Sequence, residues 1–79
     1  MAGVIHVEKL TAAQVRQLMV GSTVYLIGRD RHGYTTQQEC LVVQSGKKKV
    51  LQMRDYTGTI TTKPIRDYPG KYYTEKSAF

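Results

Sequence analysis

The pattern of hydrophobic and polar residues changes once along the chain, from a short helical spacing to a series of strand-like runs. Val15, Leu18 and Met19 are three and four residues apart, so a helix would place them on one face. The preceding run Thr11-Ala12-Ala13-Gln14 fits a capping box, in which the two end side chains satisfy backbone amides. Gly21 stands where a left-handed glycine often ends a helix. We therefore predict a short capped helix whose apolar face packs on the strands.

After this helix, β-branched and aromatic residues recur in short runs separated by turn residues, which is typical of strands. We predict strands within residues 23–27, 35–44, 48–54 and 59–62, and a candidate first edge strand at 4–7. Leu51 and Met53 alternate with more polar neighbours and therefore share one face of their strand. Ser45-Gly46-Lys47 predicts a turn, and Pro64 confines any strand beside it to a sheet edge.

One short motif, Arg-Asp-x-x-Gly, occurs three times, at residues 29–33, 54–58 and 66–70. Aspartate in the first position and glycine in the fourth position of a turn are typical of type I, which suits the first two copies. In the third copy, Tyr68-Pro69-Gly70-Lys71 instead fits a type II turn. The motif therefore predicts turns. The functional alternative is that Arg29, Arg54 and Arg66 end strands at one rim of a barrel and line up there.

The run Gly21-Ser22-Thr23-Val24-Tyr25-Leu26-Ile27-Gly28 resembles the opening strand of KOW-related, SH3-like small barrels, where a glycine precedes an apolar strand. The resemblance covers about residues 20–62, and it lacks the second glycine pair expected after the first strand. It implies a small barrel of a class that binds RNA, DNA or peptides, and it assigns no binding residues. We expect a mostly β fold with one short N-terminal α-helix, either a small SH3-like barrel or a strongly bent antiparallel sheet of four to five strands.

The length of 79 residues suits one domain. We expect this domain at residues 1–71, including the helix at 11–19, and a C-terminal tail at 72–79 that is dispensable for folding. Because Cys40 is the single cysteine, no intrachain disulfide forms, which favours a cytoplasmic location. The sequence shows neither a long apolar run nor a signal-peptide pattern, so we expect no membrane association.

Signals for catalysis are weak. His6, His32 and Cys40 are too scattered to resemble a zinc motif, and the glycines form no phosphate-binding loop. Three of the six acidic residues directly follow an arginine in a predicted turn, which disfavours a paired-carboxylate site. We therefore expect a binding protein rather than an enzyme, without metal or cofactor, and we expect Cys40 to be buried and inert.

Positive charge is concentrated in the second half of the chain. The net charge is +6; residues 1–40 carry four basic and three acidic residues, whereas residues 41–79 carry eight and three. Such a field attracts phosphate backbones, anionic membranes or acidic proteins, and it is also compatible with a basic surface that has no ligand.

The candidate binding residues are basic and aromatic. We predict nucleic-acid contacts from Lys47, Lys48, Lys49, Arg54 and Arg66, with Tyr56 and Tyr68 as base-stacking candidates. The lysines have an alternative role, because lysine at a hairpin tip also blunts edge pairing. Exposed tyrosines suit a protein interface equally well, or they cover a thin core, which is the role that we expect for Tyr25.

The leading hypothesis is a small basic protein that binds RNA or DNA mainly through the phosphate backbone. The alternative is a protein-binding adaptor or inhibitor that docks on a larger complex. A third hypothesis is a subunit whose thin core is completed by self-association. The sequence leaves the oligomeric state and the choice between RNA and DNA open.

Overall fold

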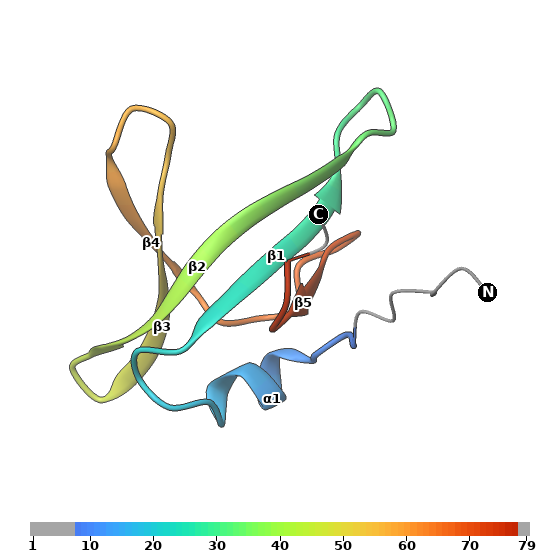
Figure 1. The fold of residues 1–79 in the computed structure, drawn as a ribbon. Helices are drawn as coiled ribbons and strands as arrows, with labels where there is room; N and C mark the ends of the chain where they lie inside the picture. The colour runs from blue at the N-terminus through green and yellow to red at the C-terminus, as the bar shows by residue number, and fades with distance from the viewer. Residues whose placement is uncertain (1–7, 78–79) are drawn as a thin grey trace.

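The computed structural model describes residues 8–77, so the edge strand expected at 4–7 lies outside the described residues. The described chain is mostly β. Its elements are α1 (Ala12–Arg16), β1 (Thr23–Arg29), β2 (Thr35–Ser45), β3 (Lys48–Arg54), β4 (Ile60–Pro64) and β5 (Tyr72–Thr74). The strands form one antiparallel sheet in the order β4-β3-β2-β1-β5 (Figure 1).

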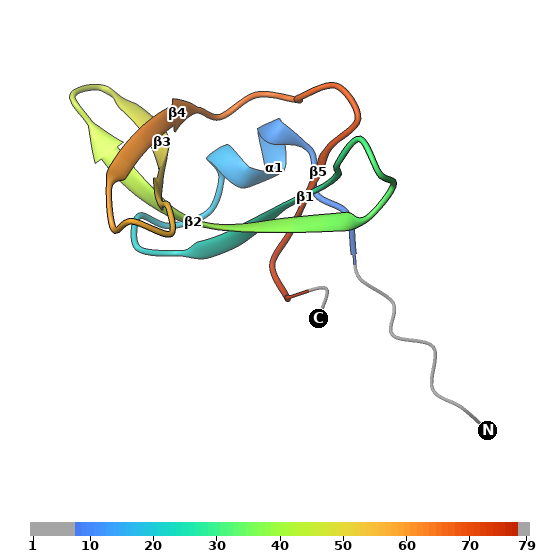
Figure 2. The ribbon, with the colours of Figure 1, turned by 90° about the horizontal axis from the view of Figure 1, so that it is seen from above.

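The sheet is open rather than closed into a barrel. Its two edge strands, β4 and β5, lie at opposite ends of the strand order and do not pair with each other. Of the two architectures expected from the sequence, the bent antiparallel sheet is therefore confirmed. Figure 2 shows α1 in the hollow of this sheet, with the segment that leads from β4 to β5 passing over it. Pro64, which has no amide to donate, lies on an edge strand as expected.

The helix begins with the predicted capping box. The Gln14 amide donates to the Thr11 hydroxyl at 3.2 Å, and the Thr11 amide donates to the Gln14 side chain at 2.8 Å. Val15 is buried and Leu18 packs against the core, both as expected. Two reciprocal hydrogen bonds thus fix the start of a helix that is too short to be stable alone.

The helix ends earlier than its hydrophobic spacing predicts. Its C-cap is Gln17, so Met19 lies beyond it and is 79% exposed instead of packing on the strands. The glycine expected to end the helix belongs to a separate turn, because the Ser22 amide donates to the Met19 carbonyl at 3.0 Å. Gly21 has φ +97° within that turn, which leads the chain into β1.

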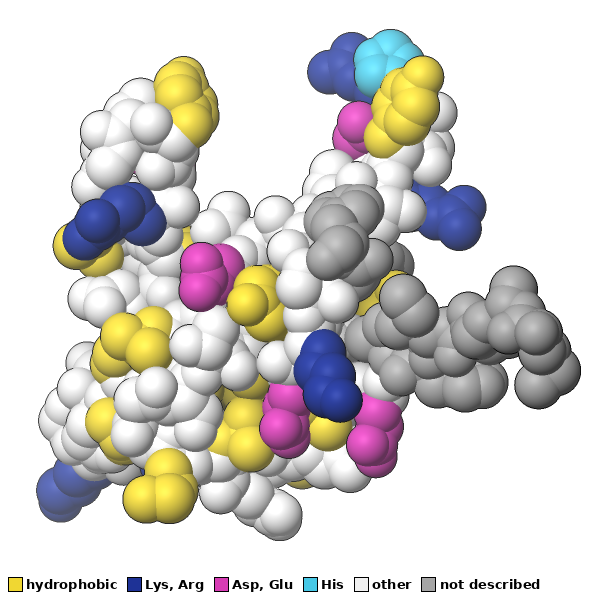
Figure 3. Space-filling view, in the orientation of Figure 1, with side chains coloured by type: hydrophobic (Ala, Val, Ile, Leu, Met, Phe, Trp, Pro, Cys, Tyr) yellow, Lys and Arg dark blue, Asp and Glu magenta, His cyan; other side chains and the backbone are white. Residues whose placement is uncertain are grey.

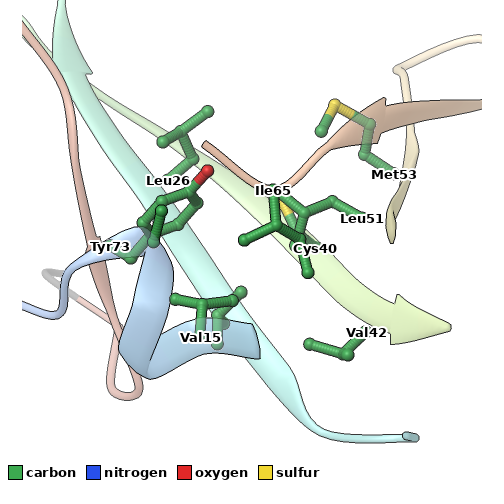
Figure 4. Packing of buried hydrophobic residues seen from close by; sticks show 10 residues of the cluster. Val15, Leu26, Cys40, Val42, Leu51, Met53, Ile65 and Tyr73 are labelled. Atoms are coloured by element: carbon green, nitrogen blue, oxygen red, sulfur yellow. The ribbon is translucent and has the colours of Figure 1, made fainter. Parts of the chain in front are cut away.

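The core lies between α1 and the concave face of the sheet, which Figure 4 shows at close range. Strand register explains its composition, because directly paired residues point to the same side of a sheet. Val24 pairs with Cys40, and Val42 pairs with Leu51, and all four are buried. Alternate residues point to the opposite face, which we call the outer face. Tyr25 is one of them; it is half-buried on the outer face and is not among the residues of the core cluster.

The C-terminal segment differs from the expected tail. Tyr72–Thr74 forms β5 and pairs with β1, and Tyr73 is only 1% exposed. The Tyr73 hydroxyl donates to the Arg66 carbonyl at 2.6 Å, so the ring fills the core while its polar atom keeps a partner. Because this region is mostly polar in sequence, the buried position of Tyr73 was not predicted. Tyr72–Thr74 belongs to the sheet rather than to a tail.

The repeated Arg-Asp-x-x-Gly motif forms the expected turns. The Gly33 amide donates to the Asp30 carbonyl and the Gly58 amide to the Asp55 carbonyl, both at 3.0 Å. Both glycines have positive φ, +84° and +88°, a region that side chains disfavour. In the third copy the Lys71 amide donates to the Tyr68 carbonyl at 3.1 Å and Gly70 has φ +73°, as a type II turn requires.

Candidate nucleic-acid interface

The sheet places the seven predicted site residues in two separate regions. β1 and β3 both run antiparallel to β2, so their last residues lie at the same end of the sheet. The β2–β3 turn lies at the opposite end. Lys47–Lys49, which we call the lysine cluster, begins at that turn. In contrast, Arg54 ends β3 and Tyr56 lies in the next turn. Lys48 and Arg54 are the first and last residues of the seven-residue strand β3, so roughly 20 Å separates them. The seven residues therefore do not form one continuous surface.

The lysine cluster lines a groove between the end of α1 and the β3–β4 edge. This groove, which we call the basic groove, encloses about 480 Å³ and is lined by Arg16, Lys47, Lys48, Lys49, Val50, Pro64 and Ile65. Four of these seven side chains are basic, and none is acidic. Lys47 and Lys48 are exposed, so their ammonium groups are accessible to a ligand.

Two of the four cations are held in place by the fold. The Lys49 ammonium donates to the carbonyls of Arg16 at 3.0 Å and Leu18 at 2.7 Å, where the helix would otherwise leave carbonyls unpaired. The Arg16 guanidinium donates in turn to the Ile65 carbonyl. These bonds connect α1 to β3 and to the segment after β4, so they fix the walls of the groove while keeping both charges at its surface.

Tyr68 and Arg66 lie beside this groove, but Tyr68 is not a free stacking platform. Its hydroxyl donates to the carbonyl of Pro64 at 2.7 Å, and the ring is half-buried. The Arg66 guanidinium lies over the ring, 4.7 Å from its centroid, and the Lys63 ammonium lies 5.8 Å from it. The ring therefore supports two cations of the protein itself through cation–π contacts, instead of offering its face to a base.

Arg54 and Tyr56 lie in the second region, at the end of the sheet with the two Arg-Asp-x-x-Gly turns. We call this region the fork; its two tips are residues 29–34 and 54–59. Figure 1 shows both tips projecting from the same end of the molecule, and Figure 3 shows a hydrophobic side chain near the end of each. Arg29 and Arg54 both lie at this end, whereas Arg66 follows the far end of β4. The alternative in which all three arginines share one rim is therefore wrong.

Sequence reasoning missed two cations of the first region, Arg16 and Lys63. Arg16 is the basic residue in the last turn of α1, and its distance from Lys47 along the chain hid their proximity. Lys63 pairs with Leu51 across β3 and β4 and so points to the helix side of the sheet. Its direction follows from the strand register, which was not known from the sequence.

Buried titratable groups indicate structural roles rather than reactive ones. Burial raises the pKa of the Cys40 thiol to about 11, so the group stays protonated near neutral pH. Burial also raises the pKa of Tyr73 to about 12. Within residues 8–77 no group of three or more histidine, cysteine or acidic side chains is placed to hold a metal ion. No helix in this part of the chain is long and apolar enough to cross a membrane.

No protein-family model, curated protein or solved structure gives a significant match to this chain. The resemblance to KOW-related barrels thus stays an expectation from one strand, and the two regions are interpreted from their own chemistry.

Proposed function

We propose that the protein binds RNA or DNA through the phosphate backbone, with the basic groove as the contact surface, and that it is not an enzyme. The observation that carries this proposal is the lining of the groove by four cations without any acidic side chain. Lys63 and Arg66 extend the positive surface along the adjacent Tyr68 ring. A surface with so many cations close together attracts a polyanion and releases counterions when it binds one.

The groove combines anchored and free cations, which suits backbone recognition. The hydrogen bonds of Lys49 and Arg16 hold their positions before any ligand arrives, so less side-chain entropy is lost on binding. Lys47 and Lys48 are exposed and adapt to the spacing of phosphates. Helix α1 has five residues and is fixed against the sheet, so within residues 8–77 no helix is offered for reading the major groove. Binding should therefore depend weakly on sequence.

The test is fluorescence anisotropy with labelled single-stranded and double-stranded oligonucleotides over a range of salt concentrations. Affinity should fall log-linearly with salt, with a slope of about −0.9 per phosphate contact on duplex DNA or about −0.7 on a single strand. The double variant Lys47→Ala, Lys48→Ala should reduce the magnitude of that slope by about two and weaken all sequences alike.

The matched control removes two charges elsewhere. Lys9 and Lys76 are exposed and do not line the basic groove, so Lys9→Ala, Lys76→Ala gives the same net charge as the groove variant. The control should keep most of the affinity. Equal losses in both double variants would show that only net charge matters and would overturn the groove as the site. An absence of binding by the unmodified protein at low salt would overturn the function itself.

A further inference from the structure

The fork is a second exposed region of the described chain, and its composition differs from that of the basic groove. Six large hydrophobic residues within residues 8–77 are notably exposed: Met19, Val20, Tyr34, Leu41, Tyr56 and Ile60. Tyr34 and Tyr56 belong to the tips of the fork. Ile60 begins β4 at the root of the second tip. Single exposed apolar residues are normal, but a group at one end of a small protein indicates an interaction surface.

The two tips hold their tyrosines on fixed turns. The Asp30 carboxylate accepts from the amides of His32 and Tyr34 at 2.9 and 3.0 Å. The Asp55 carboxylate accepts from the amides of Thr57 and Thr59, both at 2.9 Å. Tyr56 lies within the second turn with its side chain fully exposed. Rigid presentation of tyrosine lowers the conformational entropy lost on binding, a property of many protein-binding loops.

A groove on the outer face lies at the root of the second tip. It encloses about 320 Å³ and is lined by Thr23, Glu39, Cys40, Leu41, Gln52, Met53, Arg54 and Ile60. Leu41 and Ile60 give this groove an exposed apolar part. The second tip thus carries a projecting aromatic side chain, and a partly apolar hollow lies at its root. A surface that carries both a projecting side chain and a hollow can complement itself.

The charge of the fork disfavours a polyanion as its partner. Its tips and the adjoining groove carry three basic and three acidic side chains, namely Arg29, Arg31 and Arg54 with Asp30, Glu39 and Asp55. The basic groove, in contrast, is lined by four cations and no acid. The fork and the adjoining groove thus have no net charge, and they expose tyrosine, arginine and aliphatic residues. Such a composition is typical of protein interfaces.

Glu39 and Arg54 make this surface self-complementary in charge as well. They are neighbours across β2 and β3, because the adjacent residues Cys40 and Met53 are paired, and both line the outer-face groove. A two-fold contact repeats every pair of residues with the copies exchanged. Arg54 of one copy can therefore face Glu39 of the second copy, while Glu39 of the first copy faces Arg54 of the second. We infer that the fork is a docking surface for a second copy of this chain, with Tyr56 of each copy seated in the outer-face groove of the other.

The first test is sedimentation equilibrium of the full chain over a concentration series, at low and high salt and without nucleic acid. We expect a reversible monomer–dimer equilibrium that persists at high salt, because its centre is apolar. Tyr56→Ser should raise the dimer dissociation constant by about 30-fold, as for truncation of a central aromatic residue. Met19→Ser removes a 79% exposed side chain outside the fork and should leave the constant unchanged. Both side chains are exposed, so both variants should fold normally.

The second test is an exchange of charges between copies. Arg54→Glu alone and Glu39→Arg alone each place like charges across the two-fold contact and should weaken the dimer. Mixing the two variants should restore it, because in the mixed pair both contacts are again between opposite charges. Restoration on mixing is a result that an effect within one chain does not produce.

Three outcomes overturn this inference. They are a monomer at all concentrations, a dimer that Tyr56→Ser leaves unchanged, and failure of the mixed charge variants to pair. Loss of oligonucleotide affinity in Tyr56→Ser, with the chain monomeric throughout, would assign the fork to nucleic acid instead. The readout is independent of the basic groove, so failure here leaves the proposed nucleic-acid binding standing, and the reverse holds as well.

Discussion

The basic groove and the fork lie at opposite ends of the same strands, and the sequence builds them in different ways. The groove joins Arg16 near the N-terminus, the β2–β3 turn and Pro64, so it exists only when the sheet is assembled. Each tip of the fork, in contrast, is made within six consecutive residues by an aspartate that accepts from two backbone amides. Charge gathered by tertiary structure therefore defines one region, and local turn chemistry defines the other.

The largest effect on stability should come from Tyr73, which is buried in the core and hydrogen-bonded to the segment that follows β4. Tyr73→Ala leaves a cavity in the core and should lower the free energy of unfolding by about 3–5 kcal/mol. Tyr73→Phe removes only the hydrogen bond to the Arg66 carbonyl and should cost about 1 kcal/mol. Urea denaturation followed by circular dichroism measures both. If Tyr73→Ala unfolds at nearly the same urea concentration as the unmodified protein, β5 is not part of the core.

A smaller effect should be confined to the fork. Gly58 has φ +88° and its missing side chain would meet no atom within 4 Å, so only backbone strain opposes a substitution. Gly58→Ala should lower the free energy of unfolding by about 1–2 kcal/mol. Oligonucleotide affinity should not change, because the groove is at the other end. A loss of affinity with normal stability would show that the two regions are not separate.

The helix cap should link stability to the groove more weakly. Thr11→Ala removes one partner of the capping box and should cost about 1 kcal/mol of unfolding free energy. The carbonyl of Arg16, the last helical residue, and that of Leu18 just beyond the helix hold Lys49, so hydrogen exchange should increase at Leu18 and nearby amides and stay unchanged at Gly58. Equal increases at both places would indicate global loosening rather than a helix effect.

The smallest effect concerns the pKa of Asp55 in the second tip. The Thr57 hydroxyl and backbone amides of the turn donate to this carboxylate and lower its pKa below the usual value. Because the folded pKa is below the unfolded one, the tip gains stability above the unfolded pKa. That gain is lost as the pH falls through the lowered folded pKa. Thr57→Val should raise the Asp55 pKa in an NMR titration, whereas Thr23→Val on the outer face should not. An unchanged pKa in Thr57→Val would show that the hydroxyl is not the main donor.

The same contrast explains how much the sequence predicted. The capping box, the turn types, the bounds of β3 and the shared face of Leu51 and Met53 depend on neighbouring residues, and all were predicted correctly. The position of Tyr73 in the core depends on pairing with β1, and its polar surroundings gave no periodic signal. Likewise, Arg54 was predicted as a contact residue together with the lysines, although Lys48 and Arg54 lie at opposite ends of β3. Pairing between strands that are distant in sequence decides where these residues lie. The register of that pairing cannot be read from the pattern of one sequence.

The most direct test of the central claim compares one variant from each region in one experiment. The groove variant is the double substitution Lys47→Ala, Lys48→Ala, and the fork variant is Tyr56→Ser. Both variants are measured for oligonucleotide affinity over a salt series and for dimerisation without nucleic acid. The groove variant should lose affinity and salt dependence while dimerising normally. The fork variant should lose dimerisation and keep the salt slope per chain. If both variants lose the same property, the two ends of the sheet form one functional surface, and the division of roles between the basic groove and the fork is contradicted.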